Sequence, residues 1–167
     1  NTPASAQNVN LADFPKTDGK KTVADLQREV NAGQEANLLP AANNFIAGRE
    51  NRLPFGLFNQ DREPIWGPTA MYLSAGTDSP ATGPFKVAAN DFSVPAEFQS
   101  ETSKADLNSI GNGFYTANIP AARSTKKVNV LTLTQQDGGF QAAATGITTT
   151  LRDPTVAPGE KAPAVET

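Results

Sequence analysis

Apolar side chains recur at every second position in several segments of this chain, and that spacing constrains its fold most. In 52–59 the alternating residues are Leu53, Phe55 and Leu57, and 114–119 repeats the pattern. A period of two is the period of a β-strand, because successive side chains leave opposite faces. The chain is therefore predicted to be mainly β.

A later segment, 127–134, changes phase in its middle. Val128 and Val130 share one face, and Leu131 and Leu133 then share the other. Either a β-bulge or burial on both faces of the sheet explains such a slip. The sequence leaves both explanations open.

Turn signals separate these strands. The run 136–139, Gln-Asp-Gly-Gly, predicts a hairpin that joins 127–134 to a last strand over 140–151. Pro68 interrupts another strand that begins at Ile65, so it predicts an edge position or a bulge. The segment 90–113 has no clean period and is predicted to be a long connection, with Phe92 and Phe98 among its apolar anchors.

About seven short strands with turns between them, and no intervening helical pattern, predict an immunoglobulin-like antiparallel β-sandwich over 43–151. A short strand is expected at 85–88. One core is expected to contain Leu53, Phe55, Leu57, Val128, Val130 and Leu133.

The remaining chain is divided into a lead-in at 1–42 and a tail at 152–167. The lead-in contains a predicted short helix at 22–31, because Thr22 is a good N-cap residue with Asp25 three positions later. The tail is rich in proline and is predicted to be a semi-rigid linker.

Composition excludes several classes of function. The chain has no cysteine and no histidine, which removes thiolate nucleophiles, the usual zinc sites and Ser-His-Asp triads. Its net charge is −3, and its longest basic runs are pairs of lysines, so nucleic acid is not an expected partner. No apolar run reaches the roughly 18 residues of a transmembrane helix. No cofactor, metal or catalytic residue is predicted.

Some side chains still suggest a site. Trp66, Tyr72 and Phe85 lie near a loop rich in glycine and proline and are the tentative ligand contacts, as an aromatic platform for a sugar or a peptide. Packing in the core is the alternative explanation for all three, because aromatic residues usually fill a small sandwich. Arg49 and Arg52 flank Asn51 and could together hold a carboxylate, or they could be ordinary turn charges.

Acidic residues give weaker signals. The pairs Asp61/Glu63 and Glu97/Glu101 have the residue types of a glycosidase, although solvated turns explain them better. The run 137–139, Asp-Gly-Gly, lacks the ladder of oxygen donors of a calcium loop and favours a hairpin turn.

Four segments resemble a known family. They are ADFP at 12–15, GRENRLPFGLF at 48–58, MYL at 71–73 and GEKAP at 159–163. Together they are similar to the N-terminal immunoglobulin-like region of exported, often lipid-anchored, thioredoxin-like proteins of actinobacteria, and to the linker that follows it. The resemblance implies a thioredoxin-like domain after this chain and carries no catalytic residue onto it.

The expected function is that of a non-catalytic structural or interaction module outside the cytoplasm. The chain starts with small and polar residues, like the segment that follows a removed signal peptide, although trimming at that point explains the start equally well. The expected partner is the downstream domain of the same polypeptide. A sandwich that binds a carbohydrate or a peptide through an aromatic patch or an edge strand is the alternative.

Overall fold

The computed structural model of the chain describes residues 6, 8–32, 36–92, 96–98, 100, 113–120, 127–151, 159 and 161. Glu101 and most of the predicted linker at 152–167 lie outside the described residues. Within the described ranges, no helix combines the length and the apolar character needed to cross a membrane.

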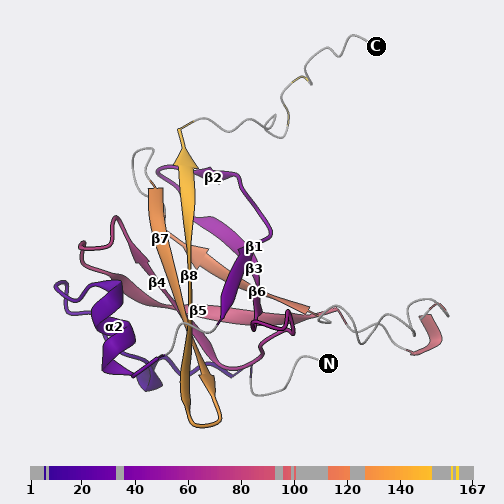
Figure 1. The fold of residues 1–167 in the computed structure, drawn as a ribbon. Coiled ribbons are helices and arrows are strands. Elements are labelled where there is room, and N and C mark those ends of the chain that lie inside the picture. Colours follow the sequence, from indigo (N-terminus) through magenta and orange to yellow (C-terminus); the bar gives the residue numbers. More distant parts are fainter. Residues whose placement is uncertain are drawn as a thin grey trace.

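Eight strands form one curled sheet with the order β1-β3-β6-β5-β4-β7-β8-β2 (Figure 1). Their bounds are Asn37–Pro40 for β1, Phe45–Ile46 for β2, Asn51–Phe58 for β3, Thr69–Ser74 for β4, Thr82–Asp91 for β5, Gly113–Ile119 for β6, Lys127–Gln136 for β7 and Gly139–Thr150 for β8. The prediction of a mainly β chain is confirmed. The expectation of purely antiparallel pairing is wrong at one place, because β2 pairs parallel with the end of β8.

Strand β5 joins the two halves of the sheet. Its first part pairs with β4, where Lys86 lies opposite Ala70, and its last part pairs with β6, where Ala89 lies opposite Tyr115. It extends well beyond the short strand expected at 85–88. The sheet curls far enough to bring β1 close to β8, although the two do not pair.

The concave side of the curl holds the first core, called here the inner core. It includes the fully buried side chains of Leu53 and Phe55, whose ring stacks on Tyr115 at a centroid distance of 5.5 Å. The other buried members are Ala36, Leu38, Phe45, Leu57, Ile65, Met71, Leu73, Val87, Ala117, Ile119, Val130, Ala143 and Ile147.

A second core, called here the outer core, lies on the opposite face of the sheet. Its buried members are Phe14, Leu26, Ala70, Tyr72, Ala81, Leu131, Leu133 and Ala142. Strand β7 therefore contributes to both cores, with Val130 in the inner core and Leu131 in the outer core. Its pairing with β8 runs from residue 127 to 136 without a shift, so burial on both faces explains the change of phase. The expectation that Leu133 shares a core with Phe55 is wrong for the same reason.

The N-terminal segment covers the outer face of β4, β7 and β8. Its helix α2, Val23–Glu29, begins at Thr22, whose hydroxyl accepts a bond from the Asp25 amide, while the Asp25 carboxylate accepts one from the Thr22 amide. This reciprocal capping box confirms the predicted N-cap. The helix packs against the sheet, because Leu26 is fully buried in the outer core.

Three hydrogen bonds attach the segment before α2 to the sheet and the adjoining loop. The Tyr72 hydroxyl donates to the Pro15 carbonyl at 2.8 Å, the Thr17 hydroxyl donates to the Gly83 carbonyl at 2.5 Å, and the Ala81 amide donates to the Lys21 carbonyl at 2.8 Å. A single-turn 3₁₀ helix, Leu11–Asp13, precedes these contacts. The segment thus forms a layer over the outer core.

Two further expectations are corrected. Strand β1 lies inside the segment predicted as lead-in, where it pairs antiparallel with β3. Pro68 stands immediately before β4, which lies between β5 and β7, so the predicted edge position is wrong. The other alternative, a bulge, has a counterpart further along β4, where the pairing with β5 shifts register between Met71 and Leu73. A proline at the start of a strand removes no ladder bond, and the Pro68 carbonyl still accepts from the Gln135 amide.

Candidate functional site

The three aromatic residues proposed as a platform do not share a face. Tyr72 is fully buried in the outer core, whereas Trp66 and Phe85 pack against the inner core and are partly buried. Neighbouring strand positions alternate between faces, so Tyr72 and the Phe85 ring on the paired strand β5 are separated by the sheet itself. Packing in the cores accounts for these positions, and no common platform forms.

Trp66 belongs to an internal anchor built around Tyr115. The Tyr115 hydroxyl accepts from the Gly67 amide at 2.8 Å and lies within bonding distance of the Ile65 and Gly67 carbonyls. The centroids of the Trp66 indole and the Tyr115 ring are 5.1 Å apart. The backbone carbonyl of Trp66 accepts a hydrogen bond from the side-chain amide of Gln136. This network fixes the loop that enters β4.

Both tyrosines are held in the neutral form. Burial raises the pKa of Tyr72 far above its ordinary value, with a smaller contribution from the negative charge of Glu29. Burial also raises the pKa of Tyr115, and the bonds to Gly67 and Thr69 oppose that shift. Each phenol has a hydrogen-bonding role in the fold, so neither is available as an acid or base at neutral pH.

Exposed aromatic residues lie elsewhere, and two of them meet where β5 ends and β6 begins. Phe92 is 61% exposed and stacks on Phe114 with a centroid distance of 4.8 Å. Phe98, in the short helix Ala96–Phe98, is 74% exposed. The pair Phe92 and Phe114 is called here the aromatic tip. Sequence reasoning missed it because an aperiodic segment with scattered phenylalanines gives no indication of which rings face solvent.

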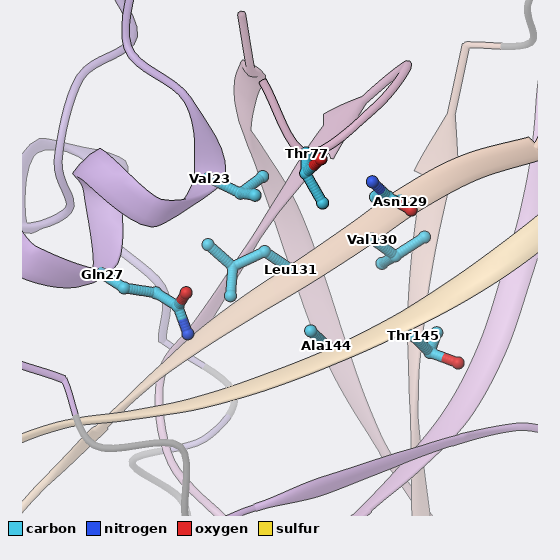
Figure 2. A pocket seen from close by; sticks show the side chains of 8 residues that line it. All are labelled: Val23, Gln27, Thr77, Asn129, Val130, Leu131, Ala144 and Thr145. Carbon is cyan, nitrogen blue, oxygen red and sulfur yellow. The ribbon is translucent and has the colours of Figure 1, made fainter. Parts of the chain in front are cut away.

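A hollow of about 260 Å³ lies between α2 and the outer face of the sheet (Figure 2). Its lining consists of Val23, Gln27, Thr77, Asn129, Val130, Leu131, Ala144 and Thr145. It lies beside α2, between the helix residues Val23 and Gln27 and the strands β7 and β8, where Ala144 is exposed. None of these side chains ionises near neutral pH, so the hollow can select a partner by shape and hydrogen bonding and cannot transfer protons.

The other candidates from sequence take structural roles or stay on the surface. The Asn59 side chain bonds both the backbone amide and the carboxylate of Glu63, which closes the turn after β3. Asp61 and Glu97 are exposed. Asp137 belongs to the β7–β8 hairpin turn, as predicted. Within the described part of the chain, no group of three or more acidic side chains converges as a metal site would require.

Asn51 is buried and holds the turn between β2 and β3. Its carbonyl oxygen accepts from the Ile46 amide at 2.8 Å, and its amide group donates to the Ile46 and Arg49 carbonyls. Arg52 points away from this turn, as an exposed residue of β3. The buried Asn51 side chain therefore stabilises this turn through its hydrogen bonds to the backbone.

The described residues thus offer two candidate surfaces for binding, the aromatic tip and the hollow beside α2, with no acid–base pair at either. None of the protein-family models compared with the chain matches it, and no curated protein matches it.

Proposed function

We propose that the chain is a non-catalytic interaction module of a longer exported protein, which holds a neighbouring domain or partner through surface contacts. The observation that carries this proposal is the distribution of its side chains. Every buried polar residue described is Asn, Ser, Thr or Tyr, while Phe92 and Phe98 are largely exposed. Phe92 stacks on Phe114, and exposed apolar surface of this kind is typical of contact sites.

The lack of buried charge among the residues that the structure describes supports a non-catalytic role. Enzymes that use acid, base or nucleophile groups usually bury a carboxylate, lysine or histidine whose pKa the site shifts. The buried ionisable groups among the described residues are Tyr72 and Tyr115, and both bond backbone groups. We therefore infer that the chain binds a partner, and that any catalysis is carried out by another domain.

The strand order supports the immunoglobulin-like form of this proposal. In that fold, strands A, B, E and D form one sheet, and C, F and G form the other. The order β1-β3-β6-β5 corresponds to the first set, and β4-β7-β8 to the second. Strand β5 pairs with both β4 and β6, so the two layers remain joined along it.

The proposed location outside the cytoplasm and the proposed partner domain are supported by the sequence. The resemblance of 48–58 and 159–163 to exported thioredoxin-like proteins supports a downstream thioredoxin-like domain in the same polypeptide. The absence of cysteine keeps the chain inert toward the redox chemistry of such a domain.

The test uses the complete reading frame. We expect it to continue into a second domain whose removal shifts the NMR signals of Phe92 and Phe114. Phe92→Ser should abolish that difference. Leu39→Ser, which removes another exposed apolar side chain, should leave it unchanged, because Leu39 lies on β1 and not on the aromatic tip. A reading frame that ends close to Thr167 would contradict the proposed partner.

Catalysis is tested separately. A screen of esterase, glycosidase, phosphatase and disulfide-reductase substrates should give no turnover with the isolated chain. Turnover that persists through repurification and disappears on changing a single carboxylate would contradict the non-catalytic assignment.

Carbohydrate binding at the aromatic tip is the second candidate. The near-parallel stack of Phe92 on Phe114, with an interplanar angle of 26°, offers a flat aromatic surface of the kind that packs against a sugar ring. Titration with maltotriose and with chitotriose should then shift Phe92 and Phe114 signals saturably. Unchanged spectra with both sugars at millimolar concentration would contradict it.

A further inference from the structure

The N-terminal segment is joined to the rest of the chain by few hydrogen bonds. Its residues 8–32 are called here the lid. Among the described residues, three hydrogen bonds cross between the lid and the remainder, and they join Pro15 to Tyr72, Thr17 to Gly83 and Lys21 to Ala81. None of the three belongs to the strand pairing. The pairing of the strands can therefore persist when these bonds break.

The sheet is complete beneath the lid. Strand β4 pairs with β5 on one side and with β7 on the other, and β7 pairs with β8 along its whole length. The backbone of β4 and β7 thus needs no partner from the lid. What the lid contributes is burial of the outer core, where Phe14 meets Phe140 edge to face and Leu26 is fully buried.

The charged side chains of α2 pair within the lid. Lys21 forms an ion pair with Glu29, and Arg28 forms one with Asp25. The capping box is also internal, because it joins Thr22 to Asp25. Separation of the lid from the sheet breaks none of these interactions. The lid therefore keeps its local hydrogen bonds and ion pairs when it leaves the sheet.

The contact between α2 and the sheet is incomplete. Val23 and Gln27 face the hollow of about 260 Å³ that separates this side of the helix from β7 and β8 (Figure 2). Leu26 is the one buried residue among the seven of α2. A helix this short depends on tertiary packing, and segments with few buried apolar contacts open at a lower free energy than the core does.

We propose that the lid opens as a unit while the sheet stays folded, so that residues 8–32 are a displaceable cover over one apolar face of β4, β7 and β8. The open form exposes the side chains that the closed form hides on that face, which are Ala70, Tyr72, Leu131, Leu133 and Ala142. It is a minor population, so equilibrium unfolding still shows one transition. The aromatic tip takes no part, and failure of this inference would leave the proposed function untouched.

Two adjacent alanines of β8 provide matched probes, because the chain has no cysteine of its own. Ala142 is buried in the outer core under the lid, and Ala143 is buried in the inner core on the other face. At low iodoacetamide concentration, Ala142→Cys should react about tenfold faster than Ala143→Cys, or more, because lid opening exposes the first thiol and global unfolding exposes the second. Matching circular dichroism spectra would establish that both variants fold.

Urea distinguishes the two routes to reaction. The dependence of an opening free energy on denaturant scales with the surface that the opening exposes. Low urea concentrations should therefore accelerate Ala143→Cys strongly and Ala142→Cys weakly. Hydrogen exchange supplies a second measurement in the unaltered chain. The Ala81 amide, which bonds the Lys21 carbonyl of the lid, should exchange faster than the Leu131 amide within β7.

Two background substitutions separate the lid from the sheet. Thr17→Val removes the hydroxyl that bonds the Gly83 carbonyl and should accelerate Ala142→Cys about threefold or more. Leu53→Val is the control, because it weakens the inner core of the closed and open forms alike. It should accelerate Ala143→Cys and leave Ala142→Cys unchanged.

Two results would overturn the proposal. Equal reaction rates for Ala142→Cys and Ala143→Cys, with the same dependence on urea, would show that the lid separates only when the whole chain unfolds. A faster reaction of Ala142→Cys that Thr17→Val leaves unchanged would show that iodoacetamide reaches this thiol by a route other than lid opening.

Discussion

Two buried tyrosines, one on each face of the sheet, form different hydrogen bonds. Tyr115→Phe removes the acceptor of the buried Gly67 amide. A buried donor without a partner costs about 1–3 kcal/mol, so we expect a loss of that size in the free energy of unfolding. Equilibrium unfolding in urea measures it.

Tyr72→Phe is the matched control. It removes one bond to the Pro15 carbonyl, and an under-bonded carbonyl is tolerated better than an unpaired amide. We therefore expect a smaller loss, about 0.5–1.5 kcal/mol. Equal losses for the two variants would contradict the anchoring role given to Tyr115.

Alkaline titration provides a second test at this scale. The chain has two tyrosines, and both have a raised pKa in the folded state. The unfolded chain should ionise near pH 10, so folding stability is fully present below that pH and declines as pH rises above it. Phenolate absorbance should therefore be missing at pH 10 in the folded chain and appear in urea. A normal phenolate step without unfolding would contradict the burial of these groups.

Some residue roles could be read from sequence and others could not. Thr22 and Asp25 signal a helix start because a capping box depends on residues three positions apart. The role of Asn51 depends on the Ile46 backbone, and its flanking arginines suggested a binding site instead. Tyr72 and Phe85 lie on opposite faces of the sheet. Strand pairing decides which face each ring occupies, and the sequence alone does not show that pairing.

Helix α2 is short, so its cap and its packing must stabilise it together. Thr22→Ala removes the hydroxyl that accepts from the Asp25 amide, and such caps contribute about 1 kcal/mol. We expect that loss in urea unfolding, together with weaker protection of Leu26. Thr22→Ser keeps the oxygen and should retain most of the stability. An unchanged Thr22→Ala variant would contradict a stabilising role for the cap.

The strands were predictable where one face alone is buried. Strand β3 alternates cleanly because its odd-numbered positions from Asn51 to Leu57 point to the inner core. Strand β1 was missed because Leu38 is its one buried residue and Pro40 ends it. The full extent of β5 was hidden by Pro84 and by a change of pairing partner along its length.

At the scale of the molecule, both cores belong to one sheet. Phe55→Ala should cost about 3–5 kcal/mol, and Leu133→Ala about 2–5 kcal/mol, because each truncates a fully buried side chain. Since β7 contributes to both cores, both variants should still unfold in a single transition. Leu39→Ala, at an exposed position, is the control and should change stability little. Separate transitions for the two faces would contradict this coupling.

The number of cores was not predictable from periodicity. A strand buried on both faces and a strand with a bulge give the same slip between Val130 and Leu131. The N-terminal segment distinguishes the two explanations, because its Phe14 and Leu26 cover the outer face of the sheet. The sequence does not show that coverage, because a short amphipathic helix can pack against any apolar surface.

The central claim is that one curled sheet carries two cores, and contacts between aromatic rings test it most directly. Nuclear Overhauser spectra should connect Phe14 with Phe140, whose centroids are 5.5 Å apart on the outer face. They should also connect Phe55 with Tyr115 at 5.5 Å on the inner face, with no contact between the two pairs. Contacts linking Phe14 or Phe140 to Phe55 or Tyr115 would show a single merged core and contradict the account.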